Sequence, residues 1–158
     1  MIQTKLFSLF TIRLEDKTMN NTKSEFQHSS LIGASIQKGI ITNQLNQSKE
    51  FYQKWLGMQI KFESDWFILL SLTQDSNFEL ALMLPNQEAV RKQYFQEAYT
   101  GKGVWLIIEV KDIRACYEEM KLQSAPIDLD LTEEEWGDIH FTLIDPNGIG
   151  IDFVQLRE

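Results

Sequence analysis

The sequence predicts an α+β fold in which two βαβββ modules form a cupped mixed sheet. A strand, a helix and three strands follow one another along the chain, and the same order then repeats. Placing Gln44-Leu45 over Asp112-Ile113 aligns the two halves with an offset of 112 − 44 = 68 residues. In both halves, turn-forming residues separate short apolar runs, which is typical of antiparallel strands. Two such modules side by side leave an inner face that is free to bind a ligand.

The first module begins with a predicted strand at residues 36–43. Ser48 is the predicted N-cap of the following helix, because its hydroxyl can accept hydrogen bonds from first-turn N–H groups. Gly57 is the predicted end of that helix, since glycine readily adopts the left-handed conformation found there. Three more strands are predicted at residues 59–63, 66–72 and 78–84.

The second module begins with a predicted strand at residues 104–110. Asp112 is the predicted cap of its helix, and Pro126 opens the strand PIDLDL. The apolar positions of the helix are Ile113, Cys116, Tyr117 and Met120. Two last strands, IHFTLI and IGIDFV, are joined by a predicted turn at residues 145–148, where proline presets φ and Asn-Gly tolerates the left-handed region.

The predicted domain spans residues 36–156, with modules at 36–84 and 103–156 and a linker at 85–102. Within the linker, four apolar residues recur at roughly helical spacing and predict a short helix. They are Val90, Tyr94, Phe95 and Ala98. Two interpretations of this segment stay open, namely a connector packed on the sheet edge and a flap over the cup.

Residues 1–35 are predicted to be an N-terminal extension that is flexible or not native. Glu15-Asp16 could be encoded by a purine-rich tract of the kind that precedes bacterial start codons, so we hypothesise that Met19 is the natural start of a bacterial protein. Residues 1–18 would then not belong to the native chain.

Composition excludes several classes of function. Fifteen basic against 23 acidic residues give a net charge of −8 and no basic stripe, which argues against nucleic-acid binding. The single cysteine, Cys116, excludes an internal disulfide and a cysteine metal cluster, and it favours a cytoplasmic location. No apolar run reaches the roughly 18 residues of a membrane span, so no membrane association is expected.

Two stretches, NQLNQSKEFYQKWLGM and WGDIHFTLIDPNGIGIDF, resemble signatures of the vicinal oxygen chelate superfamily. This superfamily includes glyoxalases, bleomycin-resistance proteins and extradiol dioxygenases. The resemblance covers about residues 36–156 and implies the glyoxalase/bleomycin resistance-like fold. It also implies a homodimer in which paired cups are completed by a second chain.

The resemblance further implies a divalent metal site with one ligand from the first and last strand of each module. The matching positions are Gln37, then either Glu79 or Ala81, then Trp105, and finally Asp152. Trp105 cannot be a ligand, because its indole nitrogen is only a donor. We therefore expect a metal-free cup with no cofactor. A divalent metal remains an alternative, and its ligands would be Gln37, Glu79 and Asp152.

The candidate ligand-binding residues are Gln37, Trp66, Trp105, Glu109, Trp136 and Asp152. Trp105 would be a stacking platform at the cup floor, or alternatively core filling. Asp152 faces the same way as Val154 and is expected to point into the cup, where its carboxylate could pair with a cationic ligand. The alternative for Asp152 is a hydrogen bond to a side chain of a neighbouring strand.

His140 is a candidate catalytic base, with a structural role as the alternative. The run at residues 133–135 is interpreted as a solvated turn. The predicted function is a metal-independent protein that sequesters an aromatic or cationic small molecule. The alternative is a metal-dependent enzyme, either a glyoxalase-like lyase or isomerase or a dioxygenase relative, and the sequence leaves open whether the protein is an enzyme.

Overall fold

The computed structural model describes residues 37–72 and 78–156. The predictions for the N-terminal extension, including a natural start at Met19, concern residues outside these ranges. Within the described residues, none of the helices is sufficiently long and apolar to cross a membrane.

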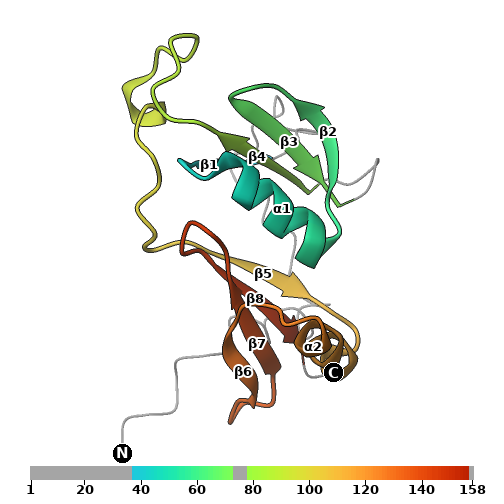
Figure 1. Ribbon diagram of the computed structural model, residues 1–158. Helices are drawn as coiled ribbons and strands as arrows, with labels where there is room; N and C mark the ends of the chain where they lie inside the picture. The colour runs from blue at the N-terminus through green and yellow to red at the C-terminus, as the bar shows by residue number, and fades with distance from the viewer. Residues whose placement is uncertain (1–36, 73–77, 157–158) are drawn as a thin grey trace, which may run out of the picture.

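The first module forms a four-stranded mixed sheet in the order β1-β4-β3-β2 (Figure 1). Its elements are β1 (Gln37–Ile41), α1 (Leu45–Leu56), β2 (Gln59–Glu63), β3 (Phe67–Ser71) and β4 (Glu79–Met83). Strands β1 and β4 run parallel, whereas β3 is antiparallel to both of its neighbours. A strand, a crossover helix and a meander of three strands produce this topology.

The second module repeats the topology, with the sheet order β5-β8-β7-β6. Its elements are β5 (Trp105–Glu109), α2 (Ile113–Leu122), β6 (Ile127–Glu133), β7 (Ile139–Ile144) and β8 (Gly150–Gln155). The first strands begin at Gln37 and Trp105, and the helices begin at Leu45 and Ile113. The predicted offset of 68 residues therefore relates both pairs, and the α+β fold of two βαβββ modules is confirmed.

Two of the three predicted helix ends are confirmed. Gly57 lies in the left-handed region at φ 65° and its N–H donates to the Gln53 carbonyl. The side chain of Asp112 caps α2 by accepting from the N–H of Ala115 at 3.0 Å.

The prediction that Ser48 caps α1 is wrong. Helix α1 begins one turn earlier, at Leu45, and Gln44 is its N-cap without a side-chain cap. Burial of Leu45 favours the earlier start, because its side chain is 8% exposed and belongs to the core. Ser48 is fully buried inside the helix, where its hydroxyl accepts a hydrogen bond from the side chain of Asn147.

Each helix covers one face of its own sheet (Figure 1). Under α1 the buried strand residues are Ile68, Leu70, Leu80 and Leu82. Under α2 they are Phe141, Leu143, Ile151 and Phe153, with the rings of Phe141 and Phe153 stacked at 4.8 Å between centroids. Successive strand residues point to opposite faces, so the residues between these form a second, open face on each sheet.

The turn at residues 145–148 joins the two modules. Asp145, only 4% exposed, accepts a hydrogen bond from the hydroxyl of Tyr52 at 3.0 Å. Asn147 contacts both Ser48 and Thr42, which lie in and just before α1. The predicted turn of the second module is therefore also the contact that holds this module against the first.

The linker contains less helix than the sequence predicts. Only Gln93–Phe95 form a single 3₁₀ turn. The side chain of Gln96 donates instead to the carbonyls of Gln87 and Val90, which closes the preceding loop on itself. Beyond the turn, the N–H of Tyr99 donates to the carbonyl of Ile41 at 2.8 Å and fixes the linker to the edge strand β1.

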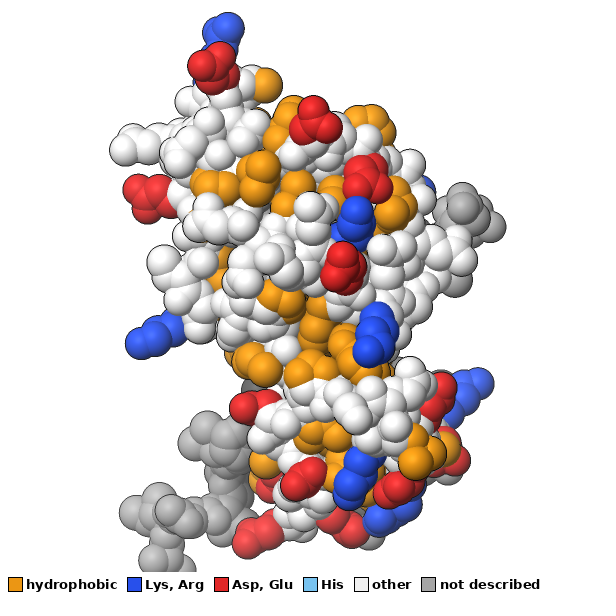
Figure 2. Space-filling model, viewed as in Figure 1, with side chains coloured by type: hydrophobic (Ala, Val, Ile, Leu, Met, Phe, Trp, Pro, Cys, Tyr) orange, Lys and Arg blue, Asp and Glu red, His pale blue; other side chains and the backbone are white. Residues whose placement is uncertain are grey.

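Hydrophobic side chains reach the surface of both modules (Figure 2). On the second module, Val104, Trp105, Ile107 and Leu129 are 52%, 61%, 42% and 41% exposed. Exposed apolar area of this kind on a sheet face is typical of a surface that binds a ligand or another chain.

Candidate functional site

On the open face of the second sheet, Trp105 and Asp152 lie on the neighbouring strands β5 and β8, diagonally offset by two residues. Parallel pairing sets Trp105 opposite Gly150 and Ile107 opposite Asp152. Because Gly150 has no side chain, no side chain stands between Trp105 and Thr142 on this face. A Cβ atom at Gly150 would lie 3.6 Å from the Thr142 side chain.

Asp152 points away from α2, as the sequence predicts, because its neighbours Ile151 and Phe153 are in the core under that helix. The hydroxyl of Thr142 donates to Oδ1 of Asp152 at 3.1 Å. The same oxygen lies 3.1 Å from Nδ1 of His140. Asp152 therefore has the side-chain partners on a neighbouring strand that the alternative interpretation expected.

His140 lies between two carboxylates. Its Nε2 is 2.9 Å from Oε1 of Glu134, while its Nδ1 faces Asp152. Partial burial lowers the pKa of His140, but hydrogen bonds to Glu134 and Asp152, together with their charges, raise its pKa above the ordinary value. The protonated imidazole can donate to both carboxylates at once. Both ring nitrogens are thus engaged, which favours the structural interpretation of His140 over that of a free base.

The position of Glu134 was not predicted from the sequence, where residues 133–135 were interpreted as a solvated turn. The turn is tight, with the N–H of Glu134 bonded to the carbonyl of Asp138 at 2.9 Å. The hairpin reverses the direction of the chain, which places His140 next to Glu134. The sequence signal that could have predicted this contact is the carboxylate just before the hairpin turn together with the histidine just after it.

The equivalent positions of the first module hold an ion pair. Oε1 of Glu79 lies 2.5 Å from Nζ of Lys61, and the amide nitrogen of Gln37 donates to the other carboxylate oxygen. These hydrogen bonds, to Lys61 first and then to Gln37, lower the pKa of the Glu79 carboxyl. The contribution of Lys61 was not predicted from the sequence.

Strand pairing resolves whether Glu79 or Ala81 corresponds to Asp152. Asp152 pairs with Ile107, which is two residues after Trp105. In the first module, the residue two after Gln37 is Gly39, and Gly39 pairs with Ala81. Ala81 is therefore the counterpart of Asp152, and an alanine side chain has no donor atom for a metal.

These residues do not fit the chelate site that the resemblance implies. At its four positions stand Gln37, Ala81, Trp105 and Asp152. Two of them offer no ligand atom. Among residues 37–72 and 78–156, no three or more His, Cys, Asp or Glu side chains are arranged to hold a metal ion. Glu134, His140 and Asp152 do meet, but the carboxylates bond opposite edges of the imidazole ring and share no common centre.

The remaining candidate residues are Trp66, Trp136 and Glu109. Trp66 is on the first module, edge-on to Phe67 with 5.8 Å between ring centroids. Trp136 is 49% exposed and its indole N–H donates to Asp138 at 3.1 Å. Glu109 is exposed at the end of β5. Within one chain, Trp66 lies in the turn between β2 and β3 of the first module, whereas Trp105 is in β5 of the second.

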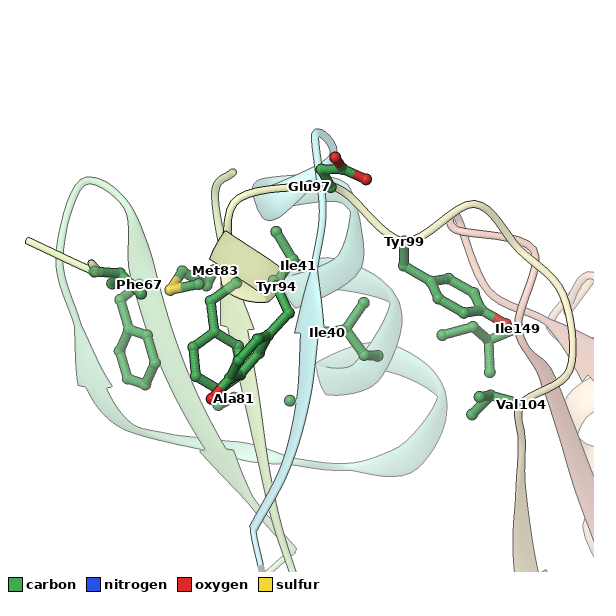
Figure 3. A pocket seen from close by; sticks show the side chains of 13 residues that line it. Ile40, Ile41, Phe67, Ala81, Met83, Tyr94, Glu97, Tyr99, Val104 and Ile149 are labelled. Atoms are coloured by element: carbon green, nitrogen blue, oxygen red, sulfur yellow. The ribbon is translucent and has the colours of Figure 1, made fainter. Parts of the chain in front are cut away.

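A cavity of about 560 Å³ lies on the open face of the first module, where the linker passes over β1 and β4 (Figure 3). It is lined by Gly39, Ile40, Ile41, Phe67, Ala81, Met83, Val90, Tyr94, Phe95, Glu97, Tyr99, Val104 and Ile149. None of the six predicted ligand-binding residues is among them. The sequence signal for it was the small pair Gly39 and Ala81, whose adjacency only the strand register reveals.

The chain belongs to the Glyoxalase/Bleomycin resistance protein/Dioxygenase superfamily, whose family model matches residues 34–153. This match confirms the resemblance seen in the two sequence signatures. No curated protein matches the chain in sequence.

Several solved structures have the same fold as this chain. A lactoylglutathione lyase from Agrobacterium tumefaciens superimposes with a TM-score of 0.61 at 12% identity, over 77% of this chain and 92% of that one. A glyoxalase/bleomycin resistance protein/dioxygenase from Alicyclobacillus acidocaldarius gives 0.57 at 18% identity, over 78% and 92%. A superfamily member from Sphaerobacter thermophilus DSM 20745 gives 0.56 at 21% identity, over 77% and 96%. At such identities the likeness concerns the fold alone.

Proposed function

We propose that this protein is a metal-independent member of its superfamily that sequesters an aromatic or cationic small molecule at the open face around Trp105. The observation that carries the proposal is the indole of Trp105, which is 61% exposed on a sheet face. An indole exposed to this extent is suited to stack on a flat ligand.

The partners of the carboxylates support metal independence. Asp152 is bonded to Thr142 and His140, and Glu79 is paired with Lys61. A lysine ammonium next to a carboxylate supplies the positive charge that a divalent ion would otherwise supply, and it repels such an ion. The alternative metal-dependent enzyme would have to break these contacts to use Asp152, or the alternative candidate Glu79, as a ligand.

The charge around Trp105 supports a preference for cations. The cluster joins two carboxylates, Glu134 and Asp152, to one imidazole that carries at most one positive charge, so it is negative in either protonation state of His140. Glu109 adds a further carboxylate on the same strand as Trp105. A negative site attracts cationic ligands more strongly than neutral ones. A cytoplasmic location belongs to the same proposal.

Tryptophan fluorescence tests the binding site. The planar cationic dye proflavine should quench the fluorescence of the wild-type protein at saturable concentrations, and the quenching should be lost in Trp105→Ala. Trp55→Phe is the matched control, because Trp55 packs against the core on α1 and lies outside the proposed site. Quenching that survives in Trp105→Ala would contradict the proposed site.

Elemental analysis tests the absence of a metal. We expect no stoichiometric nickel, zinc or iron in protein purified without chelators. Stoichiometric metal that disappears in Asp152→Ala would instead support the metal-dependent enzyme, because Asp152 is the one carboxylate at a matching ligand position.

A further inference from the structure

Asn147 and Gly148 form the one Asn-Gly pair in the sequence. In such a pair the backbone nitrogen of the glycine can attack the side-chain amide of the asparagine, because glycine has no Cβ atom to hinder the approach. The pair lies in the turn at residues 145–148, which contacts the first module through Thr42, Ser48 and Tyr52. The chemistry of this pair therefore bears on the contact between the modules.

The side-chain amide of Asn147 is held at both of its polar atoms. Nδ2 donates to Oγ of Ser48 at 3.0 Å and to Oδ2 of Asp145 at 2.9 Å. Oδ1 accepts a hydrogen bond from the hydroxyl of Thr42. The three partners Ser48, Asp145 and Thr42 are buried, with exposed fractions of 0%, 4% and 1%. Two of them, Ser48 and Thr42, belong to the first module.

The nitrogen that would attack this amide is held as well. The N–H of Gly148 donates to the carbonyl of Asp145 at 3.0 Å. From the linker, Gly101 lies so close to the turn that a Cβ atom built on it would be 3.1 Å from the main-chain oxygen of Asn147. Cyclisation removes the proton from the Gly148 nitrogen and takes the amide of Asn147 from its partners. The reaction therefore requires these contacts to break.

The reaction consumes water and releases ammonia. As the nitrogen of Gly148 bonds to Cγ of Asn147, the Cγ–Nδ2 bond breaks, and the amide nitrogen leaves as ammonia with the proton from the Gly148 nitrogen. Water then opens the cyclic imide. Attack of water at Cγ gives aspartate, whereas attack at the main-chain carbonyl carbon gives isoaspartate, in which the chain continues through Cγ.

We propose that Asn147 is a deamidation site whose reaction is controlled by the contact between the two modules. While the modules are in contact, buried partners hold the amide. When they separate, the bonds to Ser48 and Thr42 are lost, and Gly148 can react. The proposal does not depend on the function proposed above.

The products of this reaction hinder renewed contact between the modules. In aspartate an oxygen replaces Nδ2, so a second carboxylate faces Asp145 where a hydrogen bond now joins the two residues. In isoaspartate the main chain is one carbon longer, which displaces the turn. Deamidation is thus a one-way change that records the separation of the modules.

Peptide mass spectrometry of protein kept at mildly alkaline pH measures the reaction, because both products have the mass of an acid in place of an amide. Conversion of Asn147 in the folded wild-type protein should be slower by roughly tenfold or more than in guanidinium chloride, since only separated modules react. Equal rates in the folded and unfolded protein would overturn the proposal.

Two variants distinguish separation of the modules from unfolding elsewhere. Tyr52→Phe removes the bond from the first module to Asp145 and leaves the bonds of Asn147 in place. It should speed conversion in the folded protein by about tenfold, in line with the loss of one bond to a charged acceptor. Tyr117→Phe is the matched control, because it removes a bond from a buried phenol to Asp130 at 2.6 Å within the second module. It should leave the rate nearly unchanged. Equal acceleration in both variants, or none in Tyr52→Phe, would overturn control by the module contact.

Asn147→Asp tests the consequence by supplying one product directly. It should lower the midpoint of thermal unfolding by roughly 5 °C or more, because the new carboxylate faces Asp145. Asn46→Asp makes the same change at an exposed position of α1 and should be nearly neutral. A midpoint equal to that of the wild-type protein would overturn the inference that deamidation hinders renewed contact.

Discussion

At the scale of single residues, His140 makes the stability of the second module depend on pH. Glu134 and Asp152 raise its pKa above the ordinary value of 6.5 despite partial burial. A group whose pKa is raised by folding stabilises the fold in its protonated form. This stabilisation is complete below the pKa of the unfolded chain and is lost as pH rises through the higher folded pKa.

His140→Gln should therefore lower the free energy of unfolding more at about pH 5.5 than at about pH 8.5, since only the protonated imidazole bonds both carboxylates. Urea unfolding at both pH values measures the difference. Glu134→Gln should move the pKa of His140 down toward 6.5, which an NMR titration would follow. An equal loss of stability at both pH values would show that the imidazole acts without its charge.

Tyr52 is one of the residues that link the two modules. Its ring is fully buried in the first module, and its hydroxyl donates to Asp145 of the second module at 3.0 Å. Burial, together with the nearby Asp145 carboxylate, raises the pKa of this phenol, so it stays a donor at all physiological pH values.

Tyr52→Phe should destabilise the protein by about 1–3 kcal/mol, the usual cost of removing a donor from a buried charged acceptor. Chemical denaturation provides the measurement. Tyr94→Phe is the control, because Tyr94 is 73% exposed and should change stability little. If both variants unfold alike, the Tyr52–Asp145 bond contributes nothing to the contact between the modules.

At the scale of elements, helix α1 ends because Gly57 adopts φ 65°. An L-residue in this conformation is strained, so Gly57→Ala should lower the free energy of unfolding by about 1 kcal/mol. Gln53→Ala, an exposed substitution in the same helix, should be nearly neutral. Thermal unfolding of the two variants compares them directly. An equal stability of both would mean that the helix end relaxes without strain.

Local signals were enough to predict most elements. Strand β2 has the predicted bounds of 59–63, and Asp112 and Gly57 cap their helices as expected. The cap at Ser48 failed because a tertiary contact, the hydrogen bond from Asn147, determines what that hydroxyl does. A sequence pattern shows which residues can cap a helix, but it does not show which partners are brought to them by the rest of the fold.

The candidate site was less predictable, since its contacts depend on strand register. Pairing between β2 and β3 shifts between Ile60 and Phe62, so that Lys61 occupies a bulge. Lys61 reaches Glu79 from there across β3, so the contact depends on the register of three strands. In the same way, only the register of β1 with β4 makes Gly39 and Ala81 neighbours and creates the cavity.

At the scale of the whole molecule, the open faces of both sheets remain to be explained. The second module exposes a contiguous apolar strip that includes Trp105 and Ile107. On the first module, Phe62 and Tyr94 are 55% and 73% exposed. Monomeric proteins seldom leave large apolar patches uncovered, so we propose that the open faces are covered by a second copy of this chain, with ligand sites completed between two chains.

If the proposed homodimer forms, Ile107→Lys should convert it into a monomer, because the lysine places a charge in the middle of the strip that the second copy would cover. Leu122→Lys provides the matched control. Leu122 is 85% exposed at the end of α2, which covers the opposite face of the same sheet, so this variant should remain dimeric. Sedimentation velocity over a range of protein concentrations distinguishes the two states. A wild-type protein that sediments as a monomer at high concentration would rule out the dimer and would leave the Trp105 face free for ligand within a single chain.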